Sequence, residues 1–199
     1  MALVPAAMAS QMVAEGFGRG ISGSYSGPLF NAVASGATTF LLSLSAQTVD
    51  TGIAGAGVSQ MPCSLAIPAM GVSSTLASLM KGAASGQGLI GTRLNDLLDA
   101  IAAGFCGYTV SSGQVAGVHP GVGTGVGVGK FIGSNPGTAQ GFLTGAFAGQ
   151  GIIGPDSPRL IGAIATGLAS FIASLVITVS IMGPGGGVPA VSIGTVKVV

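Results

Sequence analysis

Charged side chains are the scarcest feature of this sequence, since six Lys and Arg and five Asp and Glu make up only 6% of its 199 residues. Globular domains ordinarily carry about 25% charged residues, so an ordinary charged-surface globule is excluded as the default. A net charge of +1 neutralises too few phosphates for electrostatic binding of nucleic acid. The hydrophobic content of 48% in turn excludes a charge-rich disordered chain.

Cysteine, histidine and tryptophan are also rare, with two, one and none of each. Cys63 and Cys106 make neither a disulfide framework nor, with a single histidine, a metal site. We expect both to be buried free thiols; the alternative is a crosslink, either within the chain or between subunits. The lack of tryptophan, with only two tyrosines, leaves no aromatic belt of the kind that anchors membrane proteins.

Glycine is abundant, with 37 residues, and it marks an internal repeat. Copies of Gly-x-Gly-x-x-Gly, spaced by 68 and 63 residues, occupy 18–23, 86–91 and 149–154. A second set of markers, spaced by 65 and 66 residues, consists of Phe40, Phe105 and Phe171. Recurring markers of this kind indicate a chain built from tandem units. We predict three tandem repeats over residues 1–70, 71–132 and 133–199.

Each repeat shows the same order of local signals. A short helix rich in small residues is predicted over 6–17, 74–85 and 138–148. A second helix is predicted to start at Ser26, Thr92 and Ser157, where Ser157 before Pro158 is a typical N-cap. Strand-like residues follow at 42–45, 108–110 and 175–179, and further extended runs close the repeats, clearest at 123–131 and 188–199. The sequence therefore predicts an α+β fold in which each repeat is a short helix pair followed by a β-hairpin or extended strands.

Two glycine patterns suggest nucleotide-binding loops: Gly-x-Gly-x-x-Gly formally matches a dinucleotide fingerprint, and the run 125–130 faintly resembles a P-loop. A dinucleotide fingerprint needs a strand before it, a helix after it and an acidic residue about 20 positions further on. Here a helix precedes each copy and no acid lies at that distance, so we interpret the motif as a hinge between closely packed helices. The run 125–130 lacks the first P-loop glycine, replaced by Thr124, and the Ser or Thr after the lysine, replaced by Phe131.

No catalytic constellation emerges from the polar residues. His119 stands alone before a proline in a glycine-rich turn, and no nucleophile or acid is marked as its partner. Asp96 and Asp99, three residues apart on one helix, are interpreted as a solvated or interface face. Local or cross-repeat ion pairs are expected for Arg93, Asp156 and Arg159. We therefore predict no enzyme activity, no metal, no cofactor and no small-molecule substrate.

One long uncharged segment raises a membrane alternative. Residues 160–182, 23 in number, are long enough to cross a bilayer. The equivalent stretch of the second repeat carries Arg93, Asp96 and Asp99, and a charge at the bilayer centre costs about 2.5–3.5 kcal/mol. Because three copies of one unit should share one environment, a small multi-span membrane protein, channel-like or holin-like, stays the alternative to an assembly subunit.

Three passages carry a resemblance to a known class of proteins: 98–104, 121–127 and 161–167, which join Ala/Gly-rich helices to a Val-Gly-Thr-Gly run. In style the chain resembles the structural proteins of tailed bacteriophages, tail and baseplate components above all. The resemblance implies a ring or tube subunit of a virion that binds copies of itself and other virion structural proteins. On such a reading we expect glycine-rich strand edges to pair with neighbouring subunits and interfaces above about 2,000 Å².

Overall fold

The computed structural model describes the backbone of residues 5–43, 45–53, 56–59, 63–64, 72–112, 114–119, 125–132, 134–174, 176–182 and 190–198. It describes side chains over 5–42, 73–109 and 134–174.

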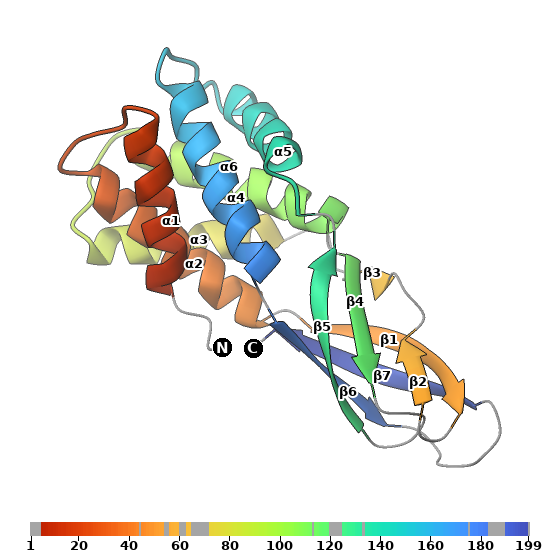
Figure 1. The fold of residues 1–199 in the computed structure, drawn as a ribbon. Helices are drawn as coiled ribbons and strands as arrows, with labels where there is room; N and C mark the ends of the chain where they lie inside the picture. Colours follow the sequence, from red (N-terminus) through yellow and green to blue (C-terminus); the bar gives the residue numbers. More distant parts are fainter. Residues whose placement is uncertain are drawn as a thin grey trace.

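Six helices form the body of the molecule. They are α1 (Pro5–Gly18), α2 (Ser26–Ser43), α3 (Val72–Gly86), α4 (Leu94–Ser112), α5 (Pro136–Gly149) and α6 (Ser157–Ser174). Each packs against the helix before it and the helix after it, and α6 returns to pack against α1, so the helices close a ring (Figure 1). The predicted first helices of the repeats lie within α1, α3 and α5.

The predicted α+β fold class is wrong for the part of the chain whose side chains are described. That part is 80% helical, holds six helices and contains no strand. One physical reason lies in α4, where the strand-like residues 108–110 continue the helix. Thr109 is buried, and its hydroxyl donates to the carbonyl oxygen of Phe105 at 2.7 Å, which lets a β-branched polar residue stay helical inside the body.

Backbone pairing joins the segments beyond that body into one antiparallel sheet, which extends from one end of the helices (Figure 1). Its strands are β1 (Ser45–Ile53), β2 (Ala56–Ser59), β3 (Cys63–Ser64), β4 (Gln114–His119), β5 (Gly125–Ile132), β6 (Val176–Met182) and β7 (Ala190–Val198). The order is β2-β1-β7-β6-β5-β4-β3, with a further pairing of β2 with β4. Strands of different repeats pair directly, as with Val49 opposite Ile193 and Val128 opposite Thr178.

This pairing occupies several of the strand edges that were expected to pair with neighbouring subunits, and pairing of strands between subunits stays a prediction. The edges where β1 meets β7 and β5 meets β6 are bonded to strands of other repeats in the same chain. Backbone N–H and C=O groups that are already paired cannot also bond a neighbour. The backbone groups of these two edges are therefore satisfied within the chain, whereas β3, which among the described strands pairs with β4 alone, ends the sheet.

Three glycines end the first helices of the repeats. Gly20, Gly88 and Gly151 adopt left-handed φ angles of 77°, 69° and 63°. The next amide in each case bonds back to the helix: Ile21 to Gly16 at 2.8 Å, Leu89 to Ala84 at 3.0 Å and Ile152 to Phe147 at 2.9 Å. This is the glycine C-cap of the Schellman type, so the Gly-x-Gly-x-x-Gly motif terminates helices and reverses the chain.

The same offsets of 68 and 63 residues continue into the second helices. Three matched amides bond to the carbonyl oxygen four residues earlier at 3.0 Å: Leu29 to Tyr25, Leu97 to Arg93 and Leu160 to Asp156. Tyr25, Arg93 and Asp156 are therefore structurally equivalent. The phenylalanine markers were three residues out of register in the second repeat, because the position matching Phe40 and Phe171 is Tyr108.

Close crossings of glycine on a neighbouring helix recur at three equivalent positions. A Cβ added to Gly36 on α2 would lie 2.8 Å from the Met80 backbone nitrogen on α3, and one added to Gly104 on α4 would lie 2.8 Å from Leu143 Cα on α5. At Gly167 on α6 the neighbour is Met12 Cγ on α1, at 2.5 Å. Each repeat thus packs its second helix onto the first helix of the next, and the third closes onto the first. We call this arrangement the pseudo-threefold ring; the repeat boundaries near residues 70 and 132 stay a prediction.

The core lies inside this ring. Equivalent side chains from the three repeats, Met12, Met80 and Leu143, are fully buried. Within the described side chains, every buried hydrophobic residue belongs to a helix. Burial among helices therefore accounts for the stability of the body.

Candidate functional site

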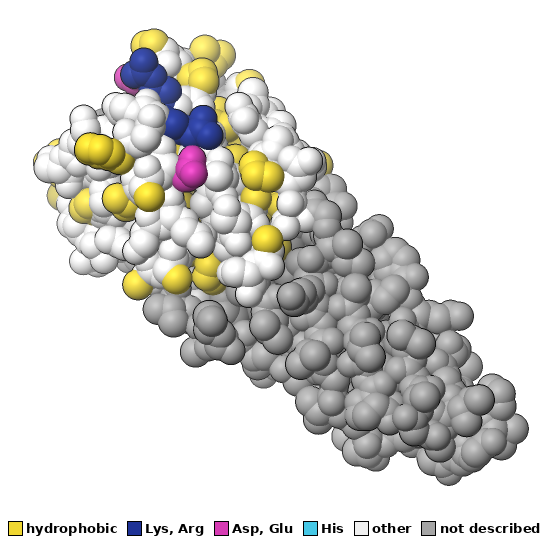
Figure 2. Space-filling model, viewed as in Figure 1, with side chains coloured by type: hydrophobic (Ala, Val, Ile, Leu, Met, Phe, Trp, Pro, Cys, Tyr) yellow, Lys and Arg dark blue, Asp and Glu magenta, His cyan; other side chains and the backbone are white. Residues whose placement is uncertain are grey.

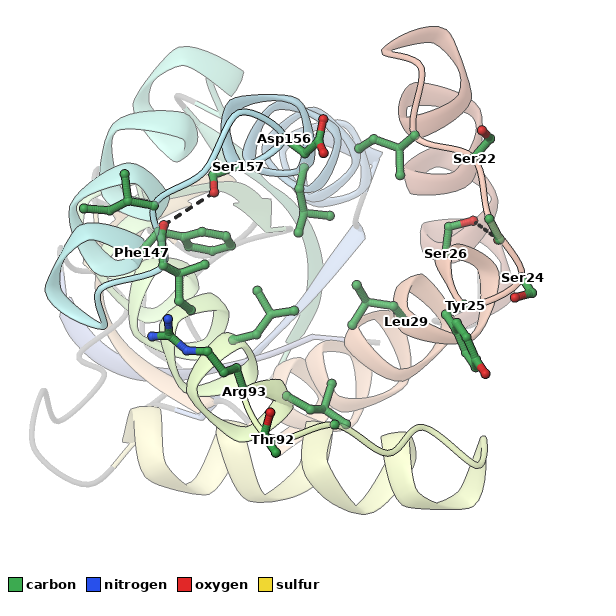
Figure 3. Close-up of a pocket in the computed structure, with 18 residues that line it drawn as sticks. Ser22, Ser24, Tyr25, Ser26, Leu29, Thr92, Arg93, Phe147, Asp156 and Ser157 are labelled. Carbon is green, nitrogen blue, oxygen red and sulfur yellow. Dashed lines mark hydrogen bonds between the residues drawn. The ribbon is translucent and has the colours of Figure 1, made fainter.

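A cavity of about 750 Å³ opens at the end of the ring where the three helix-to-helix turns meet. The turns after α1, α3 and α5 all contribute to its wall, and equivalent leucines line it, namely Leu29, Leu97 and Leu160. Figure 3 shows Leu29 pointing inward, with Phe147 on the opposite side. An apolar cavity built from three equivalent turns is therefore a candidate binding site.

Serine hydroxyls fasten two of these turns. The Ser26 hydroxyl donates to the Gly23 carbonyl oxygen at 2.8 Å, and the Ser157 hydroxyl donates to that of Ile152 at 3.5 Å (Figure 3). Ser157 was expected to accept a bond as an N-cap; in the structure it is the first residue of α6 and its hydroxyl faces back into the turn. These bonds hold the cavity wall in shape.

Large apolar side chains stand exposed on the turns that line the cavity. Ile90 is 97% exposed, Ile153 83% and Tyr25 71%. Ile90 and Ile153 are equivalent, since each is the fifth residue of its Gly-x-Gly-x-x-Gly copy. Isolated exposed apolar residues are common on protein surfaces, but a group of them beside an apolar hollow is typical of an interaction site. We call this surface the loop-end rim. It consists of Tyr25, Ile90 and Ile153 together with the ion-paired side chains described next, namely Arg93, Asp96, Asp156 and Arg159.

The rim carries two ion pairs. Arg93 Nε lies 3.6 Å from Asp96 Oδ2, and Arg159 Nη1 lies 3.4 Å from Asp156 Oδ1. All four side chains are about half exposed or more, so each pair contributes little to the stability of the free chain. On the face shown in Figure 2, charged side chains gather in one small group toward the loop end, and most of the remaining described surface is uncharged.

Arg93 also links two repeats. Its Nη2 donates to the carbonyl oxygens of Gln150 at 3.0 Å and Gly151 at 3.3 Å. These carbonyls lie just after α5, where the helix dipole favours a positive charge. The prediction of local or cross-repeat ion pairs is therefore confirmed in its local form for both arginines, and the cross-repeat contact of Arg93 is a hydrogen bond to backbone carbonyls.

The two aspartates of α4 have separate cationic partners. Asp96 pairs with Arg93, while Asp99 Oδ1 lies 2.7 Å from Lys81 Nζ on α3. The two carboxylates are therefore committed to ion pairs, as expected of a solvated or interface face. Among the residues whose structure is described, no three His, Cys, Asp or Glu side chains come together as a possible metal site.

Cys106 is a buried free thiol. Burial raises its pKa from 9.0 to about 11, because desolvation disfavours the thiolate. A thiol of this kind stays protonated and unreactive at neutral pH. Cys63 in β3 and His119 at the end of β4 have side chains outside the described part, so the predictions made for them stay predictions.

The uncharged segment 160–182 does not form a single helix. Its helical part, α6, ends at Ser174, and β6 begins at Val176. Within the part of the chain that the structure describes, none of the helices combines the length and hydropathy needed to span a bilayer.

The loop-end rim escaped sequence reasoning, although a signal for it was present. Ile90 and Ile153 interrupt glycine-rich turns at positions where a turn ordinarily carries polar residues.

No protein-family model, curated protein or solved structure matches this chain.

Proposed function

We propose that this chain is a non-enzymatic structural subunit of a large symmetric assembly, of the kind found in bacteriophage tails and baseplates. The observation that carries the proposal is the loop-end rim, where Ile90, Ile153 and Tyr25 are largely exposed on the turns that line an apolar cavity. Removing such side chains from water at an interface is favourable and lowers the free energy by about 25 cal/mol per Å² of apolar surface buried. An assembly partner supplies that cover.

The charge content supports the same function. With 6% charged residues and a net charge of +1, little electrostatic repulsion keeps free chains apart. A subunit whose surface faces other subunits needs no such repulsion. In this proposal its partners are copies of itself and other virion structural proteins.

Sedimentation of the native source material, without detergent, tests the proposal. The chain, followed by mass spectrometry, is expected to travel with dense, lipid-free particles on a density gradient. The control is the same gradient after the particles are dissociated, from which the chain should disappear at that density. If the chain instead floats with lipid and resists an alkaline wash, the assembly function is wrong and the multi-span membrane alternative takes its place.

A further inference from the structure

The charges of the loop-end rim differ between repeats in a complementary way. The helix-start position held by Tyr25 in the first repeat holds Arg93 in the second and Asp156 in the third. Three residues further on, the second repeat has Asp96 and the third has Arg159. The second and third repeats thus carry the same ion pair with its two charges exchanged.

We propose that the loop-end rim binds the rim of a second copy of this chain, head to head, about a twofold axis that places first repeat on first repeat. This inference rests on the proposed structural function and names the partner of its surface. A twofold axis of that kind sets the second repeat of one copy against the third repeat of the other. Arg93 then faces Asp156 of the copy, and Asp96 faces Arg159.

The apolar residues match in the same arrangement. Ile90 of each copy faces Ile153 of the other, because these two positions are equivalent. Tyr25, an exposed aromatic residue of the first repeat, meets its own counterpart beside the twofold axis. The two apolar cavities join under this cover. An isologous contact with an apolar centre and a charged periphery is the usual plan of a homodimer interface.

Charge excludes the other two head-to-head registers. With second repeat on second repeat, Arg93 faces Arg93 and Asp96 faces Asp96. With third on third, Asp156 and Arg159 likewise face their own kind. Like charges set directly against each other across an interface suppress that pairing, so one register of the three is selected.

The decisive test exchanges the charges within a repeat. One variant carries Arg93→Asp with Asp96→Arg, and a second carries Asp156→Arg with Arg159→Asp. Each keeps the net charge and the ion pair within its own turn, but each sets like charges against like in the dimer. Sedimentation velocity of the purified full chain is expected to show a dimer for the native sequence and a Kd weakened about tenfold or more for either variant alone.

Mixing the two exchanged variants provides the rescue. In the mixed pair the second repeat of one variant faces the third repeat of the other with opposite charges at both contacts. We therefore expect heterodimers, detected by native mass spectrometry, at nearly the native affinity. A folding defect in either variant cannot produce this result, because mixing does not repair a misfolded chain.

An apolar variant and its control complete the design. Ile90→Ser is expected to weaken the dimer about tenfold or more, since it removes an apolar contact that occurs twice. Val13→Ser, at an exposed apolar position inside α1 and outside the helix-to-helix turns, should leave the affinity unchanged.

The inference is overturned if the native chain is monomeric, if the exchanged and Ile90→Ser variants associate as well as the native chain, or if mixing restores nothing. Co-sedimentation with particles despite any of these results would retain the structural function and reject only the head-to-head contact. A rim-dependent dimer that is absent from particles would do the reverse.

Discussion

The close crossing of α2 on α3 allows a sharp test of the pseudo-threefold ring. In Gly36→Ala the new Cβ would lie 2.8 Å from the Met80 nitrogen and 3.0 Å from its Cα. Ordinary contact begins near 3.4 Å, so the two helix backbones must move apart by about 0.6 Å. Overpacking costs about 1–3 kcal/mol, and the better helix propensity of alanine offsets about 1 kcal/mol of that cost. We expect a net loss of about 1 kcal/mol.

The matched control uses the same substitution on the partner helix. Gly82 lies inside α3, the helix that Gly36 of α2 packs against, but a Cβ at Gly82 would meet no atom within 4 Å. Gly82→Ala should therefore gain about 0.5–1 kcal/mol from helix propensity alone. Urea unfolding followed by far-UV circular dichroism measures both variants, and m-values that stay equal license the comparison. The same Gly→Ala substitution is therefore expected to lower the free energy of unfolding at Gly36 and to raise it at Gly82.

The three crossings also predict a rank order. Gly104→Ala should resemble Gly36→Ala, because its Cβ meets Leu143 Cα at 2.8 Å. Gly167→Ala should cost less, since the nearest atom is Met12 Cγ on a flexible side chain and the nearest backbone atoms lie at 3.2 Å. If Gly36→Ala and Gly104→Ala both stabilise the chain as Gly82→Ala does, the helices do not approach as closely as the ring requires and the reasoning is refuted.

Three further outcomes follow from single contacts. Burial raises the pKa of Cys106 from 9.0 to about 11, so the fold should lose stability as the pH rises from about 9 to about 11, because the unfolded chain ionises first. Cys106→Ala, which installs the residue found at the equivalent Ala169, should remove that part of the pH dependence in urea titrations. Asn135 caps α5 by accepting a hydrogen bond from the Gly137 amide at 2.7 Å. Asn135→Ala should therefore lower the free energy of unfolding by about 1 kcal/mol, and Asn135→Ser should restore most of that loss. Equal stability of the native chain and both variants would reject the cap. Gly162→Ala should leave the temperature of thermal unfolding nearly unchanged, although the new Cβ would lie 2.5 Å from Arg19 Nη1. That nitrogen is at the end of a flexible side chain and can move away. A loss of stability as large as that of Gly36→Ala would show that the guanidinium is fixed.

The helices of the body could be predicted because their signals are local. Glycine at the end of the first helix and serine at the start of the second act within one turn of chain, as Gly151 and Ser157 do. The constant offset of 68 and 63 residues is likewise visible in the sequence. Where the prediction of element type failed, at residues 108–110, packing overrode propensity: Tyr108 and Thr109 are buried in the ring, and β-branched or aromatic residues follow their surroundings more than their intrinsic preference.

The ring closure and the loop-end rim could not be predicted, because both depend on contacts between distant residues. Gly167 and Met12 are 155 positions apart, and nothing local marks one as the neighbour of the other. The equivalence of Tyr25, Arg93 and Asp156 was missed for a different reason, because the offsets of the glycine motif imply it but two sets of markers with different offsets competed. The phenylalanine markers gave a register three residues away from the one that the hydrogen bonds establish, and in that register the charge exchange between repeats does not exist.

Covalent fusion of the three repeats has a consequence that a trimer of identical chains lacks. In a true trimer of identical chains, symmetry gives the same residue at every copy of a position. An arginine at the position of Arg93 would then meet only arginine at the equivalent positions of a second trimer. Here one chain places tyrosine, arginine and aspartate at equivalent points of one ring, which breaks the threefold symmetry of the rim while the ring behind it keeps the same glycine crossings. A rim of that kind can select one register of three. The divergence of charge at these positions is therefore the feature that converts a symmetric scaffold into a surface with a defined partner orientation.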